Sequence, residues 1–282
     1  MLFAACTDTG LVRTLNQDGF IVLDLQTGTR FAEEQVVGCT SGFAAWAVAD
    51  GMGGAAAGGL ASKVCLQTFA DELGVALTAG TPKSDQVPDL LLDALEAANT
   101  AVYRAASEDL ARYGMGTTFT AGLLHAGTVY VVHVGDSRLY RLRGDSLDCL
   151  TTDHSVVNRL VELGEITRDE ARTHPLKHQI TRAVGPHPSV PIDLEAHPAQ
   201  PGDLYLCCSD GLWEMVPEET LVQTLTASRA LLSRGPEAVL QDACRQLLLL
   251  ACEAGGLDNV TVLLALLGES EVPSDASPDT AN

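Results

Sequence analysis

The sequence predicts an α+β protein in which two stacked antiparallel β-sheets carry α-helices on both outer faces. Short, β-branched or alternating segments bounded by Gly and Asp predict strands, and longer segments of helical periodicity predict helices. We expect strands at 2–7, 20–25, 43–49, 117–124, 128–134, 139–143, 147–150, 190–197, 204–208 and 260–267. We expect helices at 56–77, 88–112, 155–163, 167–171, 218–225 and 236–253.

Periodicity and turn chemistry support the individual elements. In the first long helix, Leu60, Val64, Phe69 and Leu73 recur at close to helical spacing and mark its buried face. Ser and Thr residues before the two short helices are plausible N-caps. The four short segments between 117 and 150 follow one another with Gly or Asp turns between them. This pattern predicts one antiparallel meander.

Composition limits the possible partners. The 282 residues are 46% hydrophobic and show no repeat or linker, so we expect one domain at 1–268 and a disordered tail at 269–282. The net charge of −20 opposes binding to nucleic acid and to anionic lipid. No apolar run reaches the 18 or more residues of a membrane span. We therefore expect neither a nucleic-acid nor a membrane partner.

The eight cysteines indicate a reducing compartment. None of them forms a Cys-x-x-Cys pair, and several lie in apolar segments where a free thiol behaves as a small hydrophobic group. We expect a reduced, cytoplasmic protein.

Five acidic segments share one design, in which an Asp stands at or just after the end of an apolar strand beside Gly, Ser or Asn. A single Asp-Gly pair is a common turn, but several converging carboxylates repel one another unless cations neutralise them. Ligand sets that contain only oxygen favour hard ions such as Mg²⁺, Mn²⁺ or Ca²⁺. The candidate ligands are Asp18, Asp50, Asp136, Asp210 and Asp258.

The ordered set of motifs resembles the bacterial metal-dependent protein serine/threonine phosphatases, type 2C or PPM, over residues 6–267. Beyond the five acidic segments, residues 7–13 with 16–18 resemble the opening signature of this family, and 115–118 resemble the next one. Residues 150–185 resemble its flap, for which we expect a small helical subdomain at about 151–185. The resemblance implies the α-β-β-α fold and hydrolysis of phosphoserine and phosphothreonine in proteins.

The resemblance implies a role for each matching residue at two core ions, Mn²⁺ or Mg²⁺. Asp50 would bridge the two ions, and the carbonyl oxygen of Gly51 would bind one of them. Asp210 and Asp258 would complete the shell of the first ion, and Asp18 would act at the second, partly through water. A water or hydroxide between the ions would attack phosphorus in line.

Two further residues have implied roles outside the core pair. Asp136, with Asp210, would hold a third and weaker ion. Arg13 would bind the substrate phosphate, because its planar guanidinium offers two parallel donors to phosphate oxygens. The resemblance also implies phosphorylated protein partners, including a serine/threonine kinase and its targets, and we expect a monomer.

This chain departs from the family pattern near the first Asp-Gly pair. Met52 stands where eukaryotic relatives often have His, Ala55 where bacterial members often have His, and Gly59 where a Glu is common. The usual candidates for a general acid are therefore missing. His178 stands where relatives often have Asn, and the resemblance gives it no role.

Four hypotheses remain to be compared. The chain is an active phosphatase opposing a kinase, a phosphatase of a stress-response pathway, a pseudoenzyme used as a scaffold, or a metal-stabilised binding domain. Retention of every implied ligand favours activity over a pseudoenzyme, and Arg13 argues against a domain without phosphate chemistry. The Gly-rich segment 51–54 argues against a nucleotide-binding loop, because it lacks both the Gly-Lys-Ser/Thr ending of a P-loop and the glycine spacing of a dinucleotide-binding loop.

Overall fold

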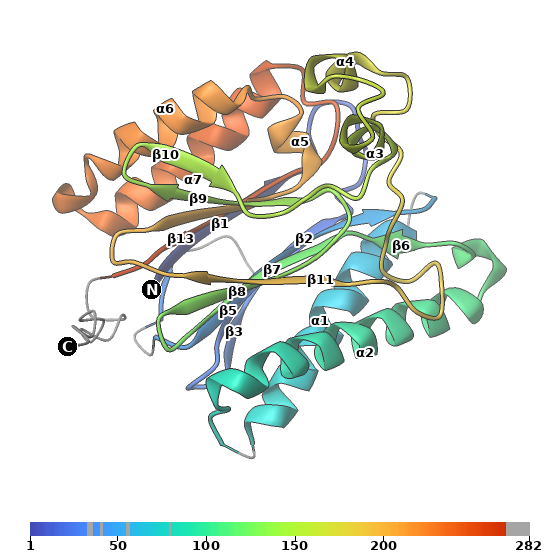
Figure 1. Ribbon diagram of the computed structural model, residues 1–282, viewed down its shortest axis with the longest axis horizontal. Coiled ribbons are helices and arrows are strands. Elements are labelled where there is room, and N and C mark those ends of the chain that lie inside the picture. The colour runs from blue at the N-terminus through green and yellow to red at the C-terminus, as the bar shows by residue number, and fades with distance from the viewer. Residues whose placement is uncertain (33–35, 40–41, 55–56, 79, 269–282) are drawn as a thin grey trace, which may run out of the picture.

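Two antiparallel sheets are packed face to face between pairs of helices in the computed structural model, which describes residues 1–32, 36–39, 42–54, 57–78 and 80–268 (Figure 1). In spatial order, the first sheet contains β10 (Ser146–Cys149), β9 (Arg138–Arg143), β12 (Leu204–Cys208), β13 (Val260–Leu266), β1 (Leu2–Asp8) and β4 (Val36–Gly38). The second contains β11 (Asp193–Pro198), β8 (Thr128–Val134), β7 (Phe119–His125), β5 (Ala44–Met52), β2 (Asp18–Asp24) and β3 (Thr29–Phe31), while β6 (Gly116–Thr117) pairs with the end of β5.

Helices cover the outer face of each sheet. The helices are α1 (Ala57–Leu77), α2 (Val87–Ser107), α3 (Val156–Glu162), α4 (Arg168–Thr173), α5 (Asp210–Trp213), α6 (Glu218–Arg229) and α7 (Pro236–Glu253). Helices α1 and α2 share a buried core with the second sheet, and α6 and α7 share another with the first. The predicted α-β-β-α fold is therefore confirmed. None of the described helices combines the length and apolar character that a bilayer span requires.

A third core between the sheets joins the two halves. Trp46 on β5 is fully buried, and its ring centroid lies 5.8 Å from that of Phe3 and 5.6 Å from that of Tyr205, both on the opposite sheet. A Cβ on Gly122 would lie 2.3 Å from the Trp46 ring, so only glycine fits on the neighbouring strand. Aromatic packing of this kind fixes how the two sheets are stacked, and with it the edge at which their acidic ends meet.

Two expectations about elements are wrong, and two short edge strands were missed. The segments between 117 and 150 do not form one meander, because β7 and β8 belong to one sheet while β9 and β10 belong to the other. The chain crosses between the sheets at residues 135–137, where a Gly at φ 116° allows the turn. Helix α2 ends at Ser107 and is followed by a separate 3₁₀ turn, Leu110–Arg112. The short edge strands β3 and β4 were not predicted, because three residues are too few to show alternation.

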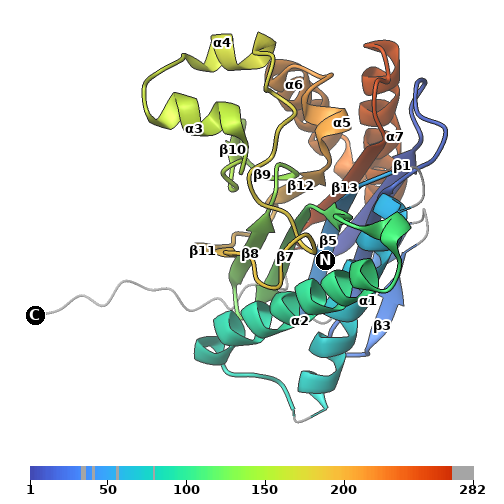
Figure 2. The ribbon, with the colours of Figure 1, turned by 90° about the vertical axis from the view of Figure 1, so that its right-hand side faces the viewer.

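Helices α3 and α4 lie within the predicted flap and stand apart from the layers, beside α5 (Figure 2). Both predicted N-caps are present: Ser155 Oγ accepts from the Asn158 amide at 3.2 Å, and Thr167 forms a capping box with Glu170. The start of the flap is tied to the sheet crossing, since the His154 amide donates to the Gly135 carbonyl at 2.7 Å. The predicted tail, 269–282, lies outside the described residues.

A buried histidine on β8 makes this junction sensitive to acid. Nδ1 of His133 lies 2.9 Å from Thr120 Oγ1, and Nε2 lies 3.2 Å from the Thr152 carbonyl oxygen. Burial, and secondarily the nearby His154, lowers the pKa of His133 to about 3. The neutral imidazole therefore stabilises the fold above the unfolded pKa of about 6.5, and this contribution is lost as the pH falls towards 3.

His133→Gln should consequently change how stability depends on pH. The difference in unfolding free energy between the wild type and the variant should be about 2 kcal/mol larger at pH 7.5 than at pH 5. Urea denaturation at both pH values, in EDTA, measures this difference. Equal differences at the two pH values would contradict the assignment of a neutral buried imidazole.

Candidate metal centre

Two of the predicted ligands, Asp18 and Asp50, face each other across neighbouring strands. They form a register pair between the first residue of β2 and the end of β5. Strand β5 continues through Asp50 to Met52, so this Asp lies within the strand rather than beyond it. The Asp18 carboxylate also contacts the other sheet, because its Oδ2 accepts from Ser209 Oγ at 2.6 Å and from Thr261 Oγ1 at 2.8 Å.

Threonines of the 115–118 motif hold the backbone of Asp50. Its amide donates to Thr118 Oγ1 at 2.9 Å, and its carbonyl accepts from the Thr118 amide at 2.8 Å and from Thr117 Oγ1 at 2.9 Å. Thr118 Oγ1 also lies 2.7 Å from Ser137 Oγ, next to Asp136. These bonds explain the threonines of the motif, which hold the backbone of Asp50 in place.

Two glycines of the segment 51–54 are needed for different reasons. Gly53 adopts a positive φ of 114°. Gly51 is required for steric reasons, because a Cβ there would lie 2.1 Å from the Gly58 carbonyl oxygen of α1. The start of α1 thereby packs directly on the strand that carries Asp50. The departure at Ala55 lies outside the described residues.

Asp210 and Asp136 meet at the short helix α5. Asp210 is its first residue, and the Trp213 Nε1 of the same turn donates to the Asp136 carbonyl oxygen at 3.0 Å. Arg138 stacks on the Trp213 ring at 3.6 Å from its centroid and forms two hydrogen bonds to Asp153 of the flap, at 2.9 and 2.7 Å. Arg138 thus joins α5 to the flap, through a cation–π contact with Trp213 and an ion pair with Asp153.

The predicted phosphate-binding residue, Arg13, contacts a predicted metal ligand. Its Nε and Nη2 donate to the two oxygens of Asp258 at 2.9 and 2.6 Å. The neighbouring Asn259 fixes the loop that carries Arg13, since its Oδ1 accepts from the Gln17 amide at 2.8 Å and its Nδ2 donates to the Leu15 carbonyl at 3.0 Å. Nη1 of Arg13 takes no part in the pair with Asp258.

The buried carboxyl groups of the site share one environment, and the pKa of each is raised. Burial is the main cause that raises the pKa of Asp18 to about 6 and that of Asp136 to about 7. Burial also raises the pKa of Asp50 and of Asp210 well above the ordinary value, and the charges of Asp18, Asp136 and Asp258 raise both further. Removing so many carboxylates from water is costly without cations to neutralise them.

The donor atoms fit divalent cations. Asp18 Oδ1 and Asp210 Oδ1 are buried without a hydrogen-bond partner, an arrangement that is expensive unless another ligand satisfies the oxygen. Sequence reasoning gave no role to Ser209, Thr261 or Asn259. The available signal was a polar side chain inside or beside a buried strand; Thr261, for example, lies within the apolar strand β13.

Comparison with known proteins agrees with the fold and with the family that the motifs predicted. A sequence model of the family described as Protein phosphatase 2C matches residues 35–247. The serine/threonine phosphatase Stp of Listeria innocua is 35% identical over 233 residues, covering 82% of this chain and 87% of Stp. The serine/threonine protein phosphatase PstP of Mycobacterium tuberculosis is 36% identical over 263 residues, covering 93% of this chain and 44% of PstP.

Solved structures give the same result. A crystal structure of M. tuberculosis PstP/Ppp matches with a TM-score of 0.77 at 34% identity, covering 95% of this chain and 99% of that one. The PstP catalytic domain in complex with two manganese ions matches with a TM-score of 0.74 at 34% identity, covering 95% and 100%. Fold and site thus define a protein phosphatase. The chain belongs to the protein phosphatase 2C family, as its ordered motifs predicted.

Replacing one buried carboxylate should stabilise the metal-free protein and weaken its binding of Mn²⁺. Asp50→Asn removes a charge that its neighbours repel, so we expect the melting temperature in EDTA at pH 8 to rise by about 2–4 °C, which corresponds to about 1 kcal/mol. Binding of Mn²⁺, measured by calorimetry, should fall sharply. The sign follows from the raised pKa of Asp50: burying the ionised carboxylate costs free energy, so the metal-free fold loses stability as the pH rises above the unfolded pKa, and Asn removes this loss.

Asp24→Asn, at the other end of β2, is the matched control. Asp24 Oδ1 accepts from the Gln26 and Thr27 amides at 3.0 and 3.2 Å, and Asn keeps this oxygen but removes its charge, so these hydrogen bonds should weaken, the melting temperature should fall and Mn²⁺ binding should stay intact. If Asp50→Asn destabilised the metal-free chain as Asp24→Asn does, the carboxylate cluster would not be under electrostatic strain.

Proposed function

We propose that this protein hydrolyses phosphoserine and phosphothreonine in proteins and requires Mn²⁺ or Mg²⁺. The observation that carries the proposal is the edge shared by both sheets, where Asp18 and Asp210 each keep a buried oxygen without a hydrogen-bond partner and Arg13 pairs with Asp258. Supporting it are the serine/threonine phosphatases among the relatives and the PstP complex with two manganese ions. Burying these carboxylates costs stability, which argues against a scaffold without activity.

In this proposal Asp18, Asp50, Asp210 and Asp258, with the Gly51 carbonyl, hold two core cations. Divalent cations at these residues would neutralise the phosphate ester and acidify the attacking water. The protein contributes rigidity. Asp50 is clamped by threonines, and Asp18 is held by hydroxyl groups of the opposite sheet, so that these carboxylates are oriented before substrate arrives.

Arg13 would bind a phosphate oxygen of the substrate. Asp258 orients the guanidinium through Nε and Nη2, while Nη1 lies outside that pair and the side chain is 56% exposed. An exposed guanidinium held on one edge by a carboxylate is a preorganised phosphate donor. Met52 and Gly59 offer no proton, and we propose no side-chain general acid in this loop.

The remaining parts of the proposal concern the cellular setting. Phosphorylated proteins would be the substrates, among them a serine/threonine kinase and its targets. We propose that the enzyme acts as a monomer in the cytoplasm, where its eight cysteines, all free in the structure, would stay reduced. A third ion shared by Asp136 and Asp210 is also part of the proposal.

The first test is metal dependence. Release of phosphate from a phosphothreonine peptide should stop in EDTA and return with Mn²⁺ or Mg²⁺, because the carboxylates cannot bring an anionic ester to the site unless cations neutralise them. Phosphate release is followed colorimetrically, with Ca²⁺ added in parallel as a control for charge alone. Full turnover by metal-free protein would refute the proposal.

A second test separates Arg13 from the metal ligands. Arg13→Ala should lower kcat/KM about ten- to a hundredfold, since a charge-assisted hydrogen bond contributes about 1.5–3 kcal/mol. Arg13→Lys keeps the charge but loses the planar fork, so it should restore activity only in part. Calorimetry without substrate should find no loss of Mn²⁺ affinity, because Asp258 is released rather than removed. Loss of metal together with activity would assign Arg13 a structural role instead.

A further inference from the structure

Exposed aliphatic side chains gather on two loops of the candidate metal centre. One loop, residues 9–17, follows β1, and the other, residues 254–259, leads from α7 to β13. The two loops lie side by side (Figure 2), since the Leu11 amide donates to the Gly256 carbonyl oxygen at 2.8 Å. Four of their side chains form what we call the apolar rim: Leu11 is 70% exposed, Val12 60%, Leu15 50% and Leu257 54%.

The apolar rim stands on an ordered backbone. Nδ2 of Asn259 donates to the Thr9 carbonyl oxygen at 2.9 Å and to the Leu15 carbonyl oxygen at 3.0 Å, which ties the first loop to the second at two points. A Cβ on Gly10 would lie 2.2 Å from the Asp258 carbonyl oxygen, so the loops pack backbone to backbone here. A surface that is already ordered binds a partner at a lower entropic cost than a loop that must first be ordered.

The position of the apolar rim distinguishes it from ordinary exposed leucines, which are common on protein surfaces. Val12 is the chain neighbour of Arg13, and Leu257 is the chain neighbour of Asp258. Two hydrogen bonds, at 2.9 and 2.6 Å, join Arg13 to Asp258, so an aliphatic side chain stands next to each member of this pair. A phosphate held by Arg13 would bring the adjacent residues of a peptide close to the rim, because an extended chain advances only about 3.3 Å per residue.

The charges of this region disfavour acidic partners. Asp8 ends β1 and Glu253 ends α7, so a carboxylate stands where each of the two loops begins. Arg13 is the only basic residue in the sequence of the two loops, and the whole chain carries a net charge of −20. An acidic residue beside the substrate phosphate would be repelled, whereas an aliphatic residue would gain free energy by leaving water against the rim.

We infer that the apolar rim binds an aliphatic side chain of the substrate, within two residues of its phosphoserine or phosphothreonine, and that this contact selects among substrates. The inference rests on the proposed function, in which Arg13 holds the phosphate. Two residues of extended chain span about 7 Å, which keeps the aliphatic side chain near Arg13.

Pairs of phosphothreonine peptides test this selection. The two peptides of a pair differ at one position, which carries Leu in one and the similarly sized Asn in the other. That position is placed in turn one and two residues before and after the phosphothreonine. With Mn²⁺, the wild type should show a kcat/KM about three- to tenfold higher for the Leu peptide at one or more positions, as partial burial of a Leu side chain predicts. A ratio near one at all four positions would overturn the inference, although hydrolysis of both peptides would uphold the proposed function.

Substitutions in the rim should remove the preference. Val12→Ser with Leu257→Ser should bring the ratio of Leu to Asn peptides to about one, and a ratio within one variant is independent of any change in its overall rate. Leu257→Met keeps an apolar side chain and should retain the preference. Val75→Ser is the matched control, because Val75 is 66% exposed but lies in the last turn of α1, whose first turn packs beside Asp50. Persistence of the preference in the double serine variant would count against the rim.

A binding measurement separates this inference from the proposed function. Fluorescence anisotropy of the same peptides, labelled, with the Ca²⁺-loaded protein needs no turnover. If no peptide is hydrolysed but the Leu peptide binds more tightly, and does so only with Val12 and Leu257 in place, the proposed function alone fails. If no peptide is hydrolysed and both bind equally, both fail. A dimer in sedimentation experiments that the double serine variant abolishes would assign the rim to a second copy of the chain and overturn the inference.

Discussion

The structure depends on the burial of carboxylates at one edge of a two-sheet sandwich. Asp18 lies at the centre of this constraint, because it pairs in register with Asp50 on its own sheet and accepts hydrogen bonds from Ser209 and Thr261 of the other. The acidic edge is therefore also the junction of the sheets. Charges that destabilise each other are retained where the fold can hold them rigidly, which is the usual trade between stability and function.

The hydrophobic core and the acidic edge act together. Trp46 packs against Phe3 and Tyr205 of the opposite sheet, which sets how one sheet lies on the other and so brings the end of β5 to the start of α5. A change of one residue in the register of β2 would turn Asp18 to the opposite face. The apolar interior thus determines the geometry of a polar site whose members share no sequence neighbourhood.

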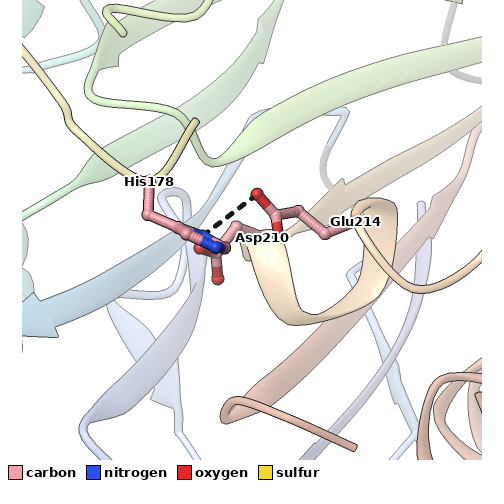
Figure 3. Close-up of side chains that lie close together, drawn as sticks. All are labelled: His178, Asp210 and Glu214. Carbon is pink, nitrogen blue, oxygen red and sulfur yellow. Dashed lines mark ion pairs between the residues drawn. The ribbon is translucent and has the colours of Figure 1, made fainter. Parts of the chain in front are cut away.

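The flap is joined to this edge by several independent contacts. Arg138 connects Trp213 to Asp153, and the crossing between the sheets at 135–137 carries both Asp136 and the backbone partner of His154. The flap therefore starts at the acidic edge rather than far from it. This anchoring places a later turn of the flap, with His178, beside α5 (Figure 3).

Much of the fold could be predicted from local signals. The strand Leu204–Cys208 and the helix Pro236–Glu253 agree with the expected boundaries, since each has a strong apolar pattern and clear turn or proline punctuation. The supposed meander was wrong because alternation identifies strands but not their partners. Edge strands of three residues carry too little pattern to be recognised.

By itself, the sequence determined the class of fold, the family and the set of acidic positions, because strand periodicity and motif order are local properties of the chain. Only the tertiary structure decided that Arg13 pairs with Asp258, that Asn259 holds the loop of Arg13, and that Glu214 and His178 meet beside Asp210. These contacts join segments far apart in the chain. They depend on strand register, on sheet stacking and on the path of the flap, which local sequence patterns do not predict.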